Sequence, residues 1–130
     1  MPENIVKASV ISELSDDIVF KRAKAAPKIS RKTKSTTEVY YRDPYVIECA
    51  KRRANGKCEM PGCTYKAFIT ENGKLYLEGH HVKPLAEGGR DAISNVVALC
   101  PLCHREQHFS KDKFGKRKLL LNQLKKKIKR

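Results

Sequence analysis

Two pairs of closely spaced cysteines are the feature that most constrains how this chain folds. Cys58 and Cys63 enclose EMPG, and Cys100 and Cys103 enclose PL. Proline or glycine in each short span permits a tight turn, so that two close pairs can direct four thiolates at one metal ion. Because the chain has only 130 residues, its apolar core is small, and a metal would supply stability that the core lacks. The spacing predicts a closed, structural zinc site.

The cysteines have a competing interpretation, because a secreted protein would use them in a disulfide framework. The N-terminal segment MPENIVKASVISEL has acidic residues early and no long apolar run, so it resembles neither a signal peptide nor a membrane span. We therefore expect a cytoplasmic protein with reduced thiols and no membrane partner. The fifth cysteine, Cys49, falls within a helical pattern, and we expect it to be a small buried apolar residue.

The positive charge of the chain is concentrated at its C-terminal end. The formal net charge is +14, and residues 111–130 hold ten Lys or Arg against one acidic residue. This composition is typical of a segment that contacts a phosphate backbone, but a tail that only aids solubility has the same composition. Charge alone does not separate these two interpretations.

The apolar pattern of the first half predicts helices. Residues 1–26 have apolar positions in loosely helical spacing, which predicts one or two short helices, and the Lys-, Arg-, Ser- and Thr-rich stretch 27–37 is typical of a linker or basic arm. The run YVIECAKRRANG predicts a helix that ends at Gly56.

The second half mixes strands and helices. The sequence KAFITENGKLYLEGHH predicts two short strands around the turn Asn72-Gly73, with Leu75 and Leu77 on one face and His81 at the end of the second strand. Residues 82–94 form a loop, NVVALC is a short strand, a helix begins near Cys103, and FGKRKLLLNQLKKKIKR is a further helix. Together these elements predict a small α+β fold.

All four histidines lie where these elements meet. His104 and His108 are four residues apart and share one helical face. His80 and His81 are adjacent on a strand, so their side chains point to opposite sides and serve different roles, one at a metal and one toward a substrate. Three imidazoles leave coordination positions open for water or substrate, which is typical of a catalytic metal site.

At this point the residues resemble a known family. The stretch LEGHHVKPLAEGGRDAISNVVALCPLCHREQH closely resembles the HNH nuclease motif, also called the ββα-metal motif, in its zinc-containing treble-clef form. The HH-x-KPL-x2-GG opening, Asn95 after the loop and the H-x3-H of the helix carry the resemblance, which covers roughly residues 45–110. Many members have Asp where this chain has His80, and the His form is most similar to McrA-type restriction endonucleases.

The resemblance implies an arrangement and a role for each part. Residues 1–44 would be an N-terminal helical arm and linker, 45–110 the nuclease domain, and 111–130 a basic C-terminal helix. His81 would be the general base toward water, and Asn95 would hydrogen-bond across the loop and hold His81 in orientation. One catalytic divalent cation would be bound by His80, His104 and His108, and the structural zinc by Cys58, Cys63, Cys100 and Cys103. The products would be 5′-phosphate and 3′-hydroxyl ends.

The ligand type adds an expectation about the catalytic metal. Three imidazoles form a softer site than one that contains a carboxylate, and imidazole suits nickel, zinc, cobalt or manganese better than magnesium. We therefore expect activity with Mn²⁺, Ni²⁺ or Co²⁺, weaker activity with Mg²⁺, and inhibition by tightly bound Zn²⁺.

Two function classes compete for this sequence. The first is a metal-dependent DNA endonuclease in restriction, phage or mobile-element biology, and the second is a noncatalytic zinc module that binds nucleic acid. His81 favours the endonuclease, because a binding module has no need of an imidazole beside three metal ligands. The DNA contacts that we expect come from Lys83, Arg90, Arg105, Lys116, Arg117 and Lys118.

The oligomeric state is left open by the sequence. The leucines of 119–124 would either form a partner face in a homodimer or pack on the domain's own core, and we favour the second interpretation.

Overall fold

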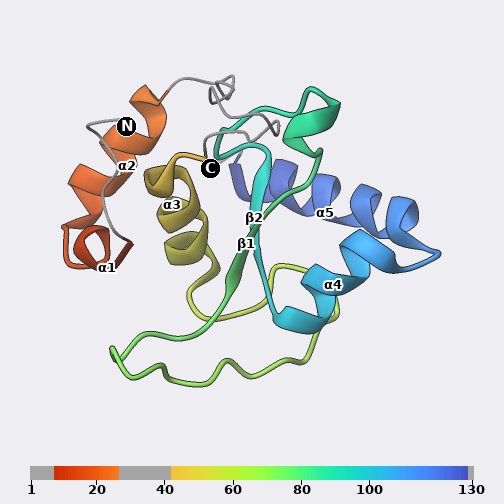
Figure 1. Cartoon of the computed structure of the whole chain (residues 1–130), viewed down its shortest axis with the longest axis horizontal. Coiled ribbons are helices and arrows are strands. Elements are labelled where there is room, and N and C mark those ends of the chain that lie inside the picture. Colours follow the sequence, from red (N-terminus) through yellow and green to blue (C-terminus); the bar gives the residue numbers. More distant parts are fainter. Residues whose placement is uncertain (1–7, 27–41, 129–130) are drawn as a thin grey trace, which may run out of the picture.

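A two-stranded antiparallel sheet lies at the centre of the protein. The computed structural model describes residues 8–26 and 42–128 (Figure 1), so the linker or arm expected at 27–37 falls outside the described residues. Strand β1 (Glu78–His81) pairs with β2 (Val96–Leu99), and His80 lies opposite Val97 in the register. Helix α3 (Pro44–Ala54) lies on one side of the sheet, and α4 (Pro101–Phe109) and α5 (Lys113–Ile128) lie on the other. These elements confirm a small α+β fold.

Strand β2 is buried on both faces, and its alternation divides the core in two. Val96 and Ala98 face α3, where they pack with residues such as Val46 and Ala54. The alternate residues Val97 and Leu99 face the cysteine cluster and α5. The apolar run NVVALC therefore contains a short buried strand, as predicted.

The N-terminal segment forms two short helices, as predicted. Helices α1 (Ala8–Ile11) and α2 (Asp16–Ala25) pack against α3 through an apolar cluster that contains Val19 and Cys49. Ser15 caps α2 by accepting a hydrogen bond from the backbone N–H of Ile18 at 3.4 Å. Cys49 is buried in this cluster, which confirms that it is a small apolar residue of the core.

Helix α3 has clear signals at both ends. Asp43 caps its first turn by accepting the N–H of Tyr45 at 2.8 Å, and Pro44 occupies the first helical position. The helix ends at Asn55, whose φ of 53° is left-handed. The predicted helix is confirmed, and Gly56, which directly follows Asn55, is also left-handed with a φ of 82°.

The hairpin predicted around Asn72-Gly73 forms only in part. Phe68 and Tyr76 share a backbone hydrogen bond and Ile69 pairs with Leu75 in an isolated bridge, but no strand extends through this segment. Leu77 is buried whereas Leu75 is 50% exposed, so only one of the two leucines predicted to share a face enters the core. The turn signal is real, but the flanking pairs bury too little apolar area to hold a regular ladder.

The C-terminal helices complete the core. Helix α5 contributes Leu120 and Leu124 to the apolar cluster that contains Cys100 and Cys103, so its leucines pack in part on the domain itself. Leu119 remains exposed on the outer face. Within residues 8–26 and 42–128, no helix is long and apolar enough to cross a membrane.

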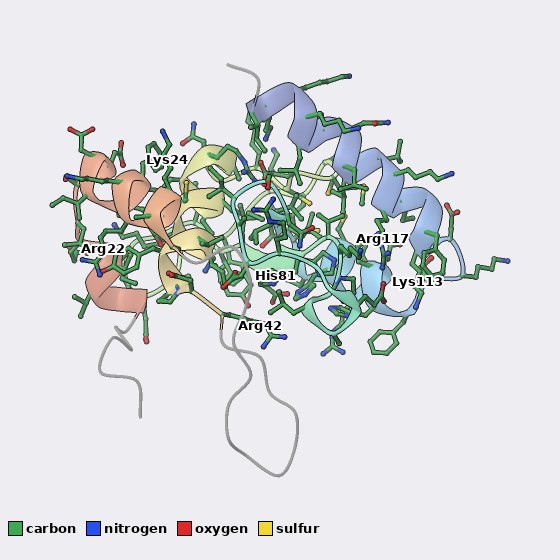
Figure 2. The ribbon with its side chains drawn as sticks, turned by 90° about the horizontal axis from the view of Figure 1, so that it is seen from above. Arg22, Lys24, Arg42, His81, Lys113 and Arg117 are labelled. Atoms are coloured by element: carbon green, nitrogen blue, oxygen red, sulfur yellow. The ribbon has the colours of Figure 1, made fainter. Side chains whose placement is uncertain are left out.

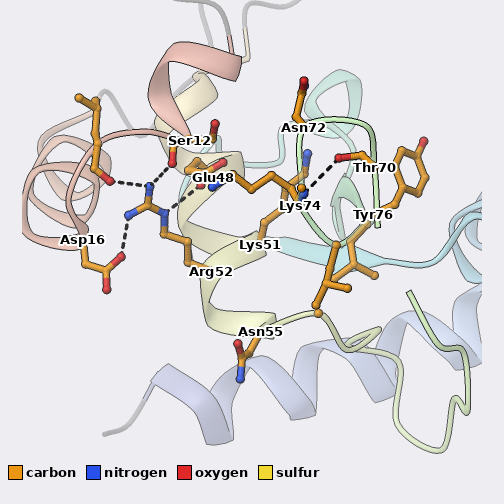
Figure 3. Close-up of a pocket in the computed structure, with 15 residues that line it drawn as sticks. Ser12, Asp16, Glu48, Lys51, Arg52, Asn55, Thr70, Asn72, Lys74 and Tyr76 are labelled. Carbon is orange, nitrogen blue, oxygen red and sulfur yellow. Dashed lines mark hydrogen bonds and ion pairs between the residues drawn. The ribbon is translucent and has the colours of Figure 1, made fainter. Parts of the chain in front are cut away.

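Arg52 ties the N-terminal helices to α3 at the edge of an open cavity of about 680 Å³ (Figure 3). Its guanidinium contacts Asp16 at 2.6 Å and the backbone carbonyl of Leu14 at 2.8 Å, while its Nε contacts Glu48 at 2.8 Å. Because Arg52 is fully engaged in these contacts, it holds α1 and α2 in place. The lining residues include no histidine or cysteine, so the cavity is separate from the clusters described next.

Candidate metal centres and active site

The four predicted zinc ligands converge between the first turn of α4 and the loop after α3. Their sulfur atoms all lie within 4.8 Å of one another, and Cys63 Sγ is 3.9 Å from Cys100 Sγ and 3.7 Å from Cys103 Sγ. Tetrahedral zinc with Zn–S bonds of about 2.3 Å places sulfurs about 3.8 Å apart. The donor set and its spacing fit one zinc ion held by Cys58, Cys63, Cys100 and Cys103.

Local structure prepares these sulfurs to bind a cation. The backbone N–H of Cys100 donates to Cys58 Sγ at 3.3 Å, and that of Cys103 donates to Cys100 Sγ at 3.4 Å. Burial raises the pKa of Cys58 to about 11 and raises that of Cys103 as well. Without a cation these thiols would stay protonated, whereas a bound metal deprotonates its thiol ligands.

The second cluster joins β1 to α4 through three imidazoles. His80 lies on β1, and His104 and His108 lie one turn apart on α4. The Nε2 atoms of His104 and His108 are 3.2 Å apart. The ring centroid of His80 lies 5.1 Å from that of His104 and 5.2 Å from that of His108. Donor atoms of all three lie within 4.8 Å of one another, a spacing that fits a single divalent cation.

The environment favours the neutral form of His80 and His108, which is the form that binds a metal. Burial, followed by the charges of His104 and His108, lowers the pKa of His80 to about 3. Burial and the charge of His104 also lower the pKa of His108. Behind His104, Glu78 Oε1 lies 2.8 Å from Nδ1, and the hydroxyl of Tyr76 donates to Glu78 Oε2 at 2.6 Å. Because the Glu78 carboxylate accepts a hydrogen bond from Nδ1–H of His104, the lone pair of this imidazole is on Nε2 and faces the other histidines.

His81 points away from this cluster and has a carboxylate of its own. Its Nε2 lies 2.8 Å from Oδ1 of Asp91, both side chains are buried, and Oδ2 of Asp91 accepts the backbone N–H of Asp43 at 2.7 Å. The Asp91 carboxylate fixes the proton on Nε2, so the lone pair of His81 is on Nδ1. An imidazole held in this tautomer can act as a general base.

Asn95 holds the loop between the two strands rather than His81 itself. Its Oδ1 accepts the N–H of Lys83 at 2.9 Å, and its Nδ2 donates to the carbonyls of Lys83 at 3.0 Å and Arg90 at 2.8 Å. Arg90 immediately precedes Asp91, so Asn95 acts on His81 through the loop that carries Asp91. At Gly89 a Cβ would lie 1.9 Å from the carbonyl oxygen of Lys83, so only glycine allows the loop to close this tightly.

Basic residues lie on two sides of His81. Seen from above, Lys113 and Arg117 lie on one side of His81, and Arg22 and Lys24 lie on the other (Figure 2). Of the DNA contacts expected from the sequence, Lys116 binds Glu106 at 2.9 Å and Arg117 lies 3.5 Å from Glu87. The other four are exposed: Lys83, Arg90, Arg105 and Lys118.

Sequence reasoning missed the two carboxylates of the site. Glu78 could have been found, because it lies two residues before His80 on one strand and therefore shares its face. Asp91 gave no local signal, since it lies in an irregular loop and meets His81 only after the loop folds back.

The HNH endonuclease family model matches residues 58–110, the stretch that contains both clusters. This part of the chain belongs to the HNH endonuclease family. The match begins at the first cysteine of the cysteine cluster and ends one residue after α4, so the HNH segment includes His81, Asp91 and Asn95.

Two curated proteins resemble the chain. The type IV methyl-directed restriction enzyme EcoKMcrA of Escherichia coli (strain K12) is 42% identical over 97 residues, which is 72% of this chain and 35% of that enzyme. Anaredoxin of Nostoc sp. (strain PCC 7120) is 50% identical over 45 residues, which is 35% of this chain and 59% of that protein.

A solved structure has a similar fold. The type IV phosphorothioation-dependent restriction endonuclease ScoMcrA superposes on 98% of this chain with a TM-score of 0.65 and 25% sequence identity. The superposition covers 24% of the ScoMcrA chain. The chain therefore spans 35% of the length of EcoKMcrA and 24% of that of ScoMcrA.

Proposed function

We propose that this chain is a metal-dependent DNA endonuclease domain that hydrolyses phosphodiester bonds to 5′-phosphate and 3′-hydroxyl ends. One observation carries the proposal: a buried imidazole, His81, is held by a carboxylate beside a cluster of three imidazoles, inside a segment of the HNH family. A noncatalytic zinc module would bind nucleic acid without needing His81 in this state.

The proton path follows from the tautomer of His81. With Nε2–H bound to Asp91, the Nδ1 lone pair removes a proton from the attacking water. The water oxygen forms a bond to phosphorus while the bond to the 3′ oxygen breaks, and the 3′ oxygen takes a proton from solvent. The Asp91 carboxylate stabilises the imidazolium that His81 becomes.

The three-imidazole cluster would hold the catalytic cation. When bound by His80, His104 and His108, a divalent cation would neutralise the charge that builds on the phosphate oxygens and on the departing 3′ oxygen. Glu78 keeps His104 in the binding tautomer. The softness of imidazole supports Mn²⁺, Ni²⁺ or Co²⁺ ahead of Mg²⁺.

The cysteine cluster would hold a structural zinc in a treble-clef arrangement. Its sulfurs lie in the apolar cluster that also contains Leu99 and Leu120. The metal would therefore join the loop that carries Cys58 and Cys63 to β2 and α5. That junction would fix the start of α4 and, with it, His104.

We propose that this nuclease domain acts in restriction. EcoKMcrA and ScoMcrA are described as type IV restriction enzymes that depend on DNA modification. Their greater length supports a division in which other parts of such a protein would select the DNA.

Plasmid cleavage tests the proposal. Supercoiled plasmid, with and without modified cytosines, would be incubated with the protein and each of Mg²⁺, Mn²⁺, Ni²⁺, Co²⁺ and Zn²⁺. We expect nicking or linearisation with Mn²⁺, Ni²⁺ or Co²⁺, loss of cleavage in His81→Ala, and normal cleavage in a surface control, Lys66→Ala. Binding of the plasmid without cleavage in any metal would support the noncatalytic zinc module instead.

A further inference from the structure

Two exposed phenylalanines lie on either side of the connection between α4 and α5, and the first of them contacts the histidine cluster. Phe109 is 76% exposed, and Phe114 is 60% exposed. Phe109 directly follows His108, and their ring centroids are 6.1 Å apart. An aromatic side chain stabilises the fold when it is buried, and an exposed one does not. Two exposed rings so close in sequence to candidate metal ligands therefore suggest a binding surface.

Two cations accompany these rings. The Nζ of Lys113 lies 5.3 Å, and the guanidinium carbon of Arg117 5.1 Å, from the centroid of the Phe114 ring. We call Phe109, Lys113, Phe114 and Arg117 the aromatic corner. Arg117 also lies 3.5 Å from Glu87, but this pair is partly exposed and contributes little, so a phosphate can replace it.

The aromatic corner adjoins the site where the scissile phosphate would sit. The ring of Phe109, the last residue of α4, lies 6.1 Å from that of His108 between centroids, and Lys113 begins α5 four residues later. In Figure 2, Lys113 and Arg117 lie on the same side of His81 as each other. A DNA strand with a phosphate at the histidines would therefore bring its neighbouring nucleotides to this corner.

We propose that the aromatic corner binds unpaired nucleotides next to the scissile phosphate, in support of the nuclease function proposed above. Phe109 and Phe114 stack on bases, and Lys113 and Arg117 contact phosphates. The combination of exposed ring faces and cations matches both parts of a nucleotide, whereas a purely apolar partner would leave the cations unused.

The proposal specifies the form of the substrate. In a duplex each base is covered by its neighbours, so a phenylalanine can stack only on a base that is single-stranded, mismatched or displaced. Stacking on an aromatic ring tolerates any base, since every base has a π face. The corner therefore confers a preference for locally unpaired DNA and not for a particular sequence.

Oligonucleotide binding tests the corner directly. The experiment uses the full chain with His81→Ala, so that the DNA is not cleaved during the measurement. The affinity of this variant would be measured for a duplex with one bulged 2-aminopurine and for the same duplex fully paired. We expect tighter binding of the bulged duplex and quenching of 2-aminopurine. Phe109→Ala or Phe114→Ala should weaken this binding by about 5- to 150-fold, the range that loss of one stacked base produces.

Matched variants separate stacking from apolar contact. Phe109→Tyr should retain the affinity, whereas Phe109→Leu should lose most of it, because leucine keeps the apolar contact but not the ring. Phe20→Ala removes a partly exposed aromatic ring on α2 and should change nothing. Unchanged binding in both alanine variants, or full affinity in the leucine variant, would overturn the proposal. So would an alanine variant that alters the oligomeric state but not DNA binding, since the corner would then contact protein.

The outcome is distinguishable from failure of the nuclease proposal. Plasmid cleavage by the unaltered chain would be measured in parallel, and it does not depend on the 2-aminopurine signal. If the unaltered chain never cleaves but the phenylalanine variants lose quenching, the aromatic corner is supported and the nuclease proposal is contradicted. If the chain cleaves DNA in a metal-dependent manner but the phenylalanine variants bind DNA normally, the nuclease is supported and the aromatic corner is contradicted.

Discussion

The Nε2 atom of His81 lies 2.8 Å from Oδ1 of Asp91, and both side chains are buried. Asp91 is itself fixed, because its second oxygen accepts the backbone N–H of Asp43 at the start of α3. The tautomer of His81 is thus set by contacts that join β1, the loop and α3. This arrangement makes Asp91 a positioning residue for the proposed base.

Replacing Asp91 with Asn should slow cleavage without weakening DNA binding. The amide keeps the shape of the side chain but no longer fixes the proton on Nε2, so His81 loses its tautomer preference. We expect kcat to fall at least about 10-fold but by less than the roughly 10²- to 10⁴-fold contributed by the base itself. Single-turnover rates and DNA affinity would be measured together, because a purely structural defect would lower both. An unchanged rate would exclude Asp91 from positioning.

Replacing Glu78 with Gln should weaken metal binding at the histidine cluster. Loss of a carboxylate behind a histidine ligand costs about 10- to 100-fold in metal affinity. Calorimetric titration with Mn²⁺ or Ni²⁺ would measure the change, and the zinc content of the cysteine site should stay constant. Tyr76→Phe removes only the hydroxyl that donates to Glu78, so its effect should be smaller. Equal metal affinity in Glu78→Gln would show that His104 needs no such support.

Replacing Cys63 with Ser should unfold the domain. Structural zinc contributes about 10–16 kcal/mol of apparent binding free energy in zinc-finger peptides, which is comparable to the whole stability of a typical domain, about 5–15 kcal/mol. Metal analysis and circular dichroism would detect the loss of zinc and structure. Cys49→Ala serves as the control, because Cys49 packs against α2 and lies outside the cysteine cluster. A folded, zinc-free Cys63→Ser variant would contradict a structural role.

Replacing Asp43 with Asn should stabilise the fold at neutral pH. Burial raises the pKa of the Asp43 carboxyl, the hydrogen bond from Tyr45 opposes this rise, and the charge of Asp91 adds to it. An acid whose folded pKa is raised destabilises the fold once it ionises, and this cost disappears as pH falls through the folded pKa toward the unfolded value of about 3.9.

The gain of Asp43→Asn over the unaltered chain should therefore be present at pH 7 and shrink toward pH 4. Urea unfolding at both pH values would measure it. Asparagine still caps α3, whereas Asp43→Ala should lose about 0.5–2 kcal/mol with the cap. A gain that is the same at both pH values would argue against ionisation of Asp43 as its cause.

Local spacing explains which parts of the fold were predictable. The helices at α3 and α5, the strand at β2 and the grouping of the cysteines depend on residues close in sequence, and the structure has them. The hairpin failed because Asn72-Gly73 specifies a turn but not the burial of its flanks, and Ile69 is 71% exposed.

Local spacing could place Glu78 on the same strand face as His80, but it did not predict which histidine either carboxylate contacts. Glu78 meets His104 across 26 residues, and Asp91 meets His81 through a loop that Asn95 closes. Such contacts depend on how the loop and α4 dock against β1, which no local pattern encodes. The sequence motif identifies the imidazoles, and the fold identifies what orients them.

The most direct test of the account is single-turnover DNA cleavage by His81→Ala. Removing the imidazole should lower the cleavage rate by about 10²- to 10⁴-fold while the bound metal, the zinc content and the DNA affinity stay the same. His80, His104 and His108 remain in place in this variant, so the cation site is preserved. Cleavage at the unaltered rate would contradict the assignment of His81 as the base and, with it, the proposed mechanism.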